Sequence, residues 1–184
     1  YSYKTIGTQV WMTENLAYLP SVVGPGTGSN STAYYYVYGY DGTDVDAAKA
    51  TSNYTTYGVL YNWPAAQSAC PSGWHLPSDA EWTTFTDDLG GASVAGGKLK
   101  EAGTAHWNSP NIGATNESGF TALPGGGRRN KGKFGGIGVN GNWWSSTVDN
   151  TNNAWNRNLG YDNSSVSRDG SSKGSGFSVR CLRD

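Results

Sequence analysis

The stretch from residue 140 to residue 163 carries the side chains best suited to binding a ligand. It holds eight asparagines beside Trp143, Trp144, Trp155 and Tyr161. Asparagine offers two donors and an acceptor with little charge to desolvate, and aromatic rings offer flat apolar faces. We therefore expect a binding surface for a glycan or a surface protein here. Its expected residues are Asn142, Trp144, Trp155, Asn156, Asn158, Tyr161 and Asn163.

The same stretch has a plainer interpretation, in which asparagine fills loops and turns because it tolerates positive φ angles. Trp143 and Trp144 are adjacent, so in a strand one ring would face the core and the other the surface. The sequence alone leaves both interpretations open.

The reactive side chains form no recognisable catalytic pattern. His75 and His106 are the only histidines, and neither has a serine or cysteine placed as in a triad. We expect both rings to be structural, with His75 hydrogen-bonded and half-buried just before a helix. No HExxH, P-loop or Rossmann fingerprint is present. The sequence therefore predicts a protein that is not an enzyme.

Two further runs of residues could bind an ion, although a plainer interpretation is favoured for each. The run Gly125–Arg129 could suggest phosphate binding, but it lacks a strand-to-helix context, so we expect a tight turn followed by exposed or paired arginines. Asp41, Asp44 and Asp46 could gather calcium, although a distant bidentate glutamate at the EF-hand spacing is missing. A solvated acidic loop is the favoured interpretation. A structural calcium ion stays open, and no other cofactor is indicated.

The chain has two cysteines, Cys70 and Cys181, which are too few for a disulfide scaffold and lack metal-site spacing. We expect them to form one disulfide, which would imply an oxidising compartment. The bridge would close a loop of roughly 110 residues and contribute on the order of 4 kcal/mol in the loop-entropy model. The alternative is two buried free thiols. A redox pair is disfavoured because neither cysteine has a CxxC partner.

Length and composition set the class of protein. The 184 residues predict one domain, residues 1–184, with enough chain to bury a core. The 27 glycines argue for many turns and little long helix. A formal net charge of −1 is unlike that of a nucleic-acid binder, and no run reaches the length of a membrane span. The chain starts at Tyr1 without a signal peptide, so we take it as a mature or excised fragment whose export is inferred.

The first half of the chain predicts short helices. Residues 20–56 are expected to form a long surface excursion, with a short strand at Tyr34–Tyr38. Asn62 can cap a short helix, and another short helix is expected over residues 94–101. The strongest helix is predicted at residues 79–89, where Ser78 and Glu81 form a capping box.

The second half predicts strands, at residues 143–147, 154–161, 166–168 and 177–182, and residues 1–19 are expected to start with a strand. In the last strand, Phe177, Val179 and Cys181 would point inward together. Early helices and late antiparallel strands indicate an α+β fold.

Five segments carry a family resemblance, and they span most of the chain. These segments are Trp11–Leu16, Cys70–Trp82, Gly119–Arg129, Trp143–Ser146 and Gly176–Asp184. On them, the chain resembles the Fibrobacter succinogenes major paralogous domain, a family found mostly in secreted or lipid-anchored surface proteins of Bacteroidetes and related bacteria. That family is similar in pattern to the C-type-lectin-like fold, in the branch shared with formylglycine-generating enzymes. The resemblance implies two or three short helices packed on small antiparallel sheets, and an extracellular or cell-surface location, with any lipid anchor outside this segment.

The sequence departs from two activities of the related branch. Formylglycine-generating enzymes use reactive cysteines to bind copper, whereas both cysteines here are expected to be joined. Sugar-binding C-type lectins hold calcium with a Trp-Asn-Asp run, and here Trp155-Asn156-Arg157 has arginine in the last place. We therefore expect a non-catalytic recognition or adhesion domain. The alternatives are a formylglycine-type oxidase or other enzyme on the same scaffold, and a structural module of a surface fibre or multidomain adhesin.

Overall fold

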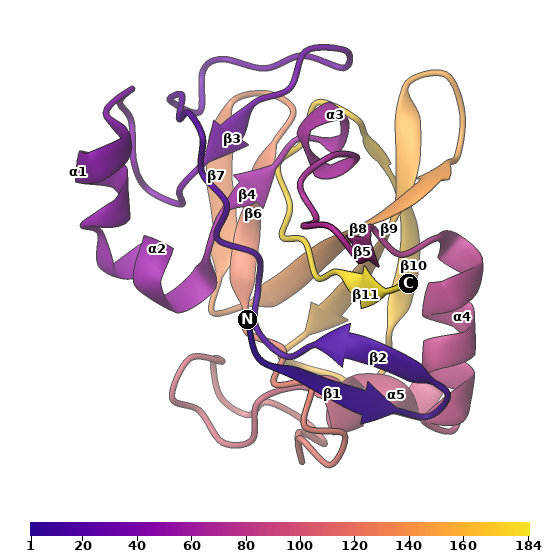
Figure 1. The fold of residues 1–184 in the computed structure, drawn as a ribbon. Helices are drawn as coiled ribbons and strands as arrows, with labels where there is room; N and C mark the ends of the chain where they lie inside the picture. Colours follow the sequence, from indigo (N-terminus) through magenta and orange to yellow (C-terminus); the bar gives the residue numbers. More distant parts are fainter.

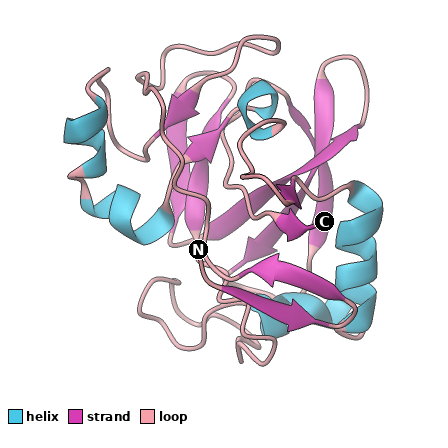
Figure 2. Ribbon diagram, in the orientation of Figure 1, coloured by secondary structure: helices cyan, strands magenta, loops and turns pink.

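Five short helices and three small β-sheets build the chain, which the computed structural model describes over residues 1–184 (Figure 1; Figure 2). Helices and strands alternate in the first half, and strands dominate the second half. The fold is therefore α+β, as the sequence predicted. None of the helices has both the length and the apolar character that a membrane crossing requires.

The largest sheet has five strands in the order β10-β9-β8-β6-β7. Its strands are β6 (Gly125–Arg129), β7 (Lys133–Ile137), β8 (Asn140–Val148), β9 (Asn153–Gly160) and β10 (Ser167–Ser172). Strands β8 and β9 are antiparallel, so that Asn142 pairs with Asn158 and Trp144 with Asn156. The predicted strands at residues 143–147, 154–161 and 166–168 correspond to β8, β9 and the start of β10. The β6–β7 hairpin was not predicted.

A second sheet joins the two ends of the chain, in the order β1-β2-β11-β5. Its strands are β1 (Tyr3–Ile6), β2 (Gln9–Met12), β5 (Trp74–His75) and β11 (Leu182–Arg183). Leu182 pairs with Trp11 on one side and with His75 on the other. The C-terminal strand therefore lies between the N-terminal hairpin and the segment that leads into α4 (Asp79–Asp88).

Residues 20–56 contain more regular structure than the sequence suggested. Strand β3 (Tyr35–Tyr36) pairs with β4 (Leu60–Tyr61), and two helices follow it, α1 (Val45–Lys49) and α2 (Ser52–Tyr57). Asp44 caps α1 through its side chain, and Thr51 caps α2 in the same way. These two helices were not predicted, because each is too short to show a recognisable apolar periodicity in the sequence.

The three predicted helices are all present. Asn62 caps α3 (Trp63–Ala66), and Ser78 with Glu81 forms the predicted capping box at the start of α4. Helix α5 (Ala92–Leu99) begins two residues earlier than expected. Figure 1 shows α4 and α5 together at one side of the molecule, next to the ends of β9 and β10.

The predicted strand at residues 177–182 is regular only at its end, in β11. Before it, Phe177 forms a single bridge with Tyr61, and Ser178 forms one with Trp143. The segment is irregular because it passes between different sheets and pairs with each only briefly. Val179 and Cys181 are buried and Phe177 is half-buried.

Cys70 and Cys181 form the predicted disulfide, with their Cα atoms 5.9 Å apart. The core consists of two clusters of buried side chains on opposite sides of β8 and β9. One contains Trp144 and Cys181, and the other contains Trp143 and Leu159. Apolar burial on both sides explains how a chain with only 36% hydrophobic residues has a continuous core.

Candidate functional site

The residues predicted to bind a ligand are divided between two faces of the β8–β9 strand pair. Asn142, Trp144, Asn156 and Asn158 share one face, as their register requires. Trp155 lies on the opposite face. Tyr161 and Asn163 lie beyond the end of β9, where Tyr161 packs against the second core cluster and Asn163 is exposed. The predicted set is therefore not one continuous surface.

Two members of the set are interior residues. Trp144 has 0% of its surface exposed, and its indole N–H donates to the Tyr61 carbonyl at 2.8 Å. Asn156 is 1% exposed and donates to the Ser171 hydroxyl at 2.6 Å. Trp143 is also buried, so the expected alternation of the two tryptophans between core and surface is wrong. The prediction failed because each face of β8 is covered by one of the two core clusters.

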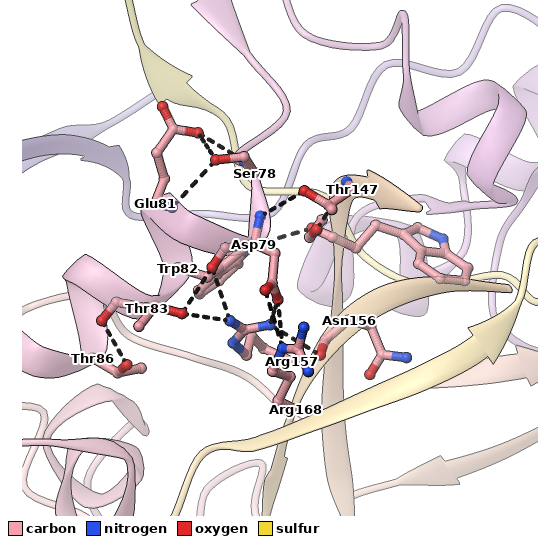
Figure 3. Close-up of polar contacts among 12 residues, drawn as sticks. Ser78, Asp79, Glu81, Trp82, Thr83, Thr86, Thr147, Asn156, Arg157 and Arg168 are labelled. Atoms are coloured by element: carbon pink, nitrogen blue, oxygen red, sulfur yellow. Dashed lines mark hydrogen bonds and ion pairs between the residues drawn. The ribbon is translucent and has the colours of Figure 1, made fainter. Parts of the chain in front are cut away.

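A polar network of Asp79, Arg157 and Arg168 fastens α4 to the sheet (Figure 3), and Trp155 contacts this network through Arg168. The guanidinium of Arg168 lies 3.4 Å over the Trp155 ring, so this face of the ring is occupied. The same guanidinium donates to the Asp79 carboxylate at 2.9 Å, and Arg157 donates to it at 2.7 Å. Partial burial alone would raise the pKa of Asp79, but the hydrogen bonds from both arginines outweigh burial and lower that pKa.

Asn142 and Asn158 form a chain of amides across the sheet. The Asn158 amide donates to the Asn142 side-chain oxygen at 2.8 Å, and the Asn142 amide donates to the Gly126 carbonyl at 3.0 Å. Both side chains are half-buried. Of the seven predicted binding residues, only Asn142 lines a pocket.

That pocket is part of a larger depression around the β6–β7 hairpin, which we call the hairpin groove. It consists of three adjoining pockets of about 490, 340 and 200 Å³. The first and second pockets share Asn130 and Ser172, and the second and third pockets share Arg129 and Phe177. The remaining lining residues are Gly26, Gly28, Ser29, Asn30, Gly127, Arg128, Lys131, Gly132, Gly135, Gly136, Asn140, Asn142, Gly170, Ser171, Gly174 and Ser175.

The hairpin groove is polar and positively charged. Phe177 is its one hydrophobic residue, and none of its lining residues is acidic. Arg129 and Lys131 are exposed and form no ion pair or hydrogen bond through their side chains. Both cationic side chains are therefore available to bind a ligand.

Arg128 holds the walls of the hairpin groove together from inside. It is 1% exposed, and its guanidinium donates to the Pro25 carbonyl at 2.7 and 2.8 Å and to the Gly174 carbonyl at 2.6 Å. It also lies over the Tyr36 ring, 5.0 Å from the centroid. The expected tight turn at Gly125–Arg129 is wrong, since these residues form β6. The arginines were expected to be exposed or paired, and Arg128 is paired, with backbone carbonyls as its partners.

Two other buried cations have the same type of environment. The Lys100 ammonium donates to the carbonyls of Ile112, Gly160 and Asn163 at 2.8 to 3.0 Å, and burial lowers its pKa to about 8. The Arg180 guanidinium donates to the carbonyls of Phe120 and Thr121, and burial lowers its pKa to about 9. Lys100 binds carbonyls from three separate segments, whereas Arg180 binds the carbonyls of two adjacent residues and the side-chain oxygen of the distant Asn15. Each cation therefore joins segments that are far apart in the sequence.

The histidines have structural surroundings. His75 lies with Nδ1 2.6 Å from Asp184 and Nε2 2.9 Å from Glu81. Burial alone would lower the pKa of His75, but the hydrogen bonds to Asp184 and Glu81 outweigh it and raise that pKa. The Ser78 hydroxyl donates to Glu81 and not to the imidazole, unlike the order in a catalytic triad. His106 pairs with Glu101 at 2.9 Å.

The acidic run at residues 41–46 does not converge on a point. Asp44 uses its carboxylate to accept from the Ala47 N–H, which caps α1. No three histidine, cysteine, aspartate or glutamate side chains form a group that could hold a metal ion.

Asn130 and Lys131 were not predicted as site residues, and Arg129 was considered only within the phosphate-binding alternative for Gly125–Arg129, which a tight turn displaced. One further signal was present in the sequence. Residues 118–148 contain four basic residues and no acidic residue, in a chain whose net charge is −1. Such a run predicts a local positive field wherever it folds.

A disulfide-bridged α+β domain with a polar groove beside its largest sheet is the class of protein that these features define. Within that class, the chain belongs to the Fibrobacter succinogenes major domain family, whose model matches residues 5–183. This match confirms the resemblance that the sequence segments carried. No curated protein and no solved structure matches the chain.

Proposed function

We propose that this protein is a non-catalytic recognition domain on the outside of a bacterial cell, which binds a glycan in the hairpin groove. The observation that carries the proposal is the groove itself, in which three adjoining pockets are lined almost wholly by polar side chains and glycines. Sugars present many hydroxyls and few apolar surfaces, so they match a lining rich in serine, asparagine and arginine.

The chemistry of the lining argues against a small apolar ligand. Pockets for such ligands are lined mainly by hydrophobic and aromatic residues. Phe177 alone supplies a ring here, and it packs against the buried Trp144 ring with centroids 4.6 Å apart. This support holds the ring in place, so a sugar could stack on its open side.

The extracellular location and the fold branch are parts of the same proposal. The Cys70–Cys181 disulfide favours an oxidising compartment, because such bridges are rare in reducing ones. A C-type-lectin-like fold is supported by two short helices beside a curled sheet, antiparallel except for the β6–β8 pair, and by the return of β11 to the N-terminal hairpin. An oxidase of the formylglycine type needs a free cysteine, and no cysteine here is free.

A glycan-array screen with three single variants tests the proposed function. Arg129→Ala removes an exposed cation that lines two of the three pockets. Lys133→Ala removes an exposed cation of the same hairpin that lines none, and is the matched control. Asn163→Ala changes an exposed predicted residue outside the hairpin groove. We expect binding to fall only in Arg129→Ala.

Two results would contradict this assignment. A loss of binding in Asn163→Ala with Arg129→Ala unaffected would move the site to the end of β9. No binding by the wild-type domain to any glycan, together with capture of a purified surface protein, would replace the glycan with a protein partner.

A further inference from the structure

We infer that the 490 Å³ pocket of the hairpin groove is a subsite for the anionic group of an acidic glycan, a carboxylate or a sulfate ester. The inference rests on the proposed function and names the class of glycan. The pocket lies where the loop of residues 26–30 approaches the β6–β7 turn and residues 172–174. We call it the anion pocket.

The charge of the anion pocket has one sign. Its ten lining residues include Arg128 and Lys131 and no aspartate or glutamate. Arg129 follows Arg128 on the same strand and lines the adjoining pocket. An oxyanion that enters this pocket is therefore attracted by the cations, and no carboxylate of the lining repels it.

The Arg128 guanidinium has unused hydrogen-bonding capacity. It makes three hydrogen bonds, to Pro25 and Gly174, whereas a guanidinium carries five N–H donors. The remaining donors belong to the terminal nitrogens, which are the atoms that bind carboxylate or sulfate most strongly. Because the side chain is held by its other bonds, it needs no reordering when a ligand binds.

Gly28 packs closely on this guanidinium, and its lack of a side chain leaves the space beside the terminal nitrogens free. A Cβ atom built at Gly28 would lie 2.6 Å from Nη2 and 2.7 Å from Nη1 of Arg128, so any other residue would collide with both terminal nitrogens. The backbone N–H groups of Gly26 and Gly28 make no hydrogen bond within the chain. Both glycines line the anion pocket, so these N–H groups are uncharged donors that a bound anion can use.

The size of the anion pocket favours a sugar ring with its acidic substituent over a free ion. A volume of about 490 Å³ falls within the usual range of ligand pockets, roughly 300–1,000 Å³. Its continuity with the second pocket through Asn130 and Ser172 leaves room for neighbouring sugars along the hairpin groove. An oligosaccharide with spaced acidic groups therefore fits the arrangement of cations at Lys131, Arg128 and Arg129.

Gly26 offers a clean way to test the inference. It lines the anion pocket, and a Cβ atom built there meets no other atom within 4 Å. Gly26→Glu and Gly26→Gln place side chains of nearly equal shape in the pocket, and only the first carries a negative charge. Both variants are expected to fold like the wild type, which equal melting temperatures would verify.

The probes are oligogalacturonate with its methyl ester, and a sulfated galactan oligosaccharide with its desulfated form, titrated by calorimetry. We expect the wild type to bind one acidic probe at least about tenfold more tightly than its neutral partner, with the difference reduced by salt. The probe that binds decides between carboxylate and sulfate. Gly26→Glu should abolish the preference, whereas Gly26→Gln should retain it. Lys131→Gln should weaken acidic binding by about fivefold, and Lys133→Gln should not.

Equal binding of each acidic probe and its neutral partner by the wild type, still sensitive to Arg129→Ala, would overturn the anionic subsite and leave glycan binding intact. Equal losses in Gly26→Glu and Gly26→Gln would also overturn it, because obstruction and not charge would then be responsible. Absence of binding to all four probes and to every arrayed glycan would remove the proposed function, and the subsite with it.

Discussion

At the scale of single residues, charged side chains in this protein are positioned mainly by burial and by fixed partners. Asp79 receives hydrogen bonds from Arg157, which is nearly fully buried, and from Arg168, which is largely exposed. The carboxylate is the only acidic partner of the Arg157 guanidinium. Removal of its charge would leave a buried cation with only neutral acceptors, which is costly in a medium of low dielectric.

Asp79→Asn is therefore expected to lower the free energy of unfolding by about 2–3 kcal/mol near neutral pH. Because the folded-state pKa of Asp79 is lowered, the stabilisation by its charge is present above the unfolded-state pKa and is lost as pH falls through the folded-state pKa. The difference between variant and wild type should therefore shrink in acid. Urea unfolding at neutral and acidic pH measures this difference, with Asp87→Asn, a change at an exposed aspartate of α4 without an ion pair, as control. A constant difference at all pH values would contradict this account.

His75 should show the opposite dependence on pH. Its folded-state pKa is raised, so the stabilisation by the imidazolium is complete below the unfolded-state pKa and is lost as pH rises through the folded-state pKa. His75→Gln should thus destabilise the protein near pH 5.5 and have little effect at about pH 8.5. The effect is expected to be modest, since 38% of the side chain is exposed and solvent screens the ion pairs.

Denaturant midpoints measured across this pH range provide the test. In Asp184→Asn the dependence should be weaker, because one of the two carboxylates beside the ring is then neutral. A destabilisation by His75→Gln that grows with pH would show that the raised pKa is not the cause.

At the scale of elements, local signals decide where α4 begins. Ser78 accepts from the Glu81 N–H at 3.2 Å, and the Glu81 carboxylate accepts from the Ser78 N–H at 2.7 Å. Ser78→Ala should lower the free energy of unfolding by about 1 kcal/mol, through loss of one cap and of the carboxylate's orientation. Thermal unfolding checks this, with the exposed mid-helix change Thr84→Ala as control. If both variants lose equal stability, the capping box is not what defines the start of this helix.

Elements with such local signals could be predicted, and elements without them could not. Asn62, Ser78 and Gly90-Gly91 mark helix ends by the chemistry of the backbone itself, so the start of α3 and both ends of α4 were predicted nearly correctly. The hairpin β6–β7 depends instead on pairing with β8 through Gly126 and Gly141. Glycine has low strand propensity, so the sequence pointed to a turn. Tertiary packing decided the outcome.

The candidate site was likewise predictable only in part. The sequence identified the asparagine-rich strands, and it included Asn142 and Asn158 among the expected binding residues. It did not foresee that Trp144 and Asn156 lie inside, because burial on both faces of a sheet depends on segments distant in sequence, such as residues 177–181. The cations of the hairpin groove became recognisable only once the hairpin brought Arg129 and Lys131 beside Asn30 and Ser172.

At the scale of the whole molecule, long-range links hold many loops in one arrangement. Arg128 joins residues 25 and 174, Arg180 joins Asn15 to residues 120–121, and Lys100 joins residues 112, 160 and 163. Each cation satisfies carbonyl groups that would otherwise lack a partner in the interior, which is costly. The hairpin groove is therefore shaped by the same contacts that stabilise the fold, and we expect it to be largely formed before a ligand binds.

The disulfide is the covalent member of this set of long-range links, and its contribution can be measured directly. It joins residues 111 positions apart, so reduction should lower the free energy of unfolding by about 4–5 kcal/mol in the loop-entropy model. Guanidinium unfolding of oxidised and reduced wild type, beside the Cys70→Ser/Cys181→Ser variant, separates the constraint on the unfolded chain from packing at buried Cys181. Reduced protein should lose only the stabilisation that comes from closing the loop in the unfolded chain. The double variant should lose more of its free energy of unfolding, because it also buries a hydroxyl. Equal stability of oxidised and reduced protein would mean that the carbonyl-bound cations alone hold the two halves of the chain together.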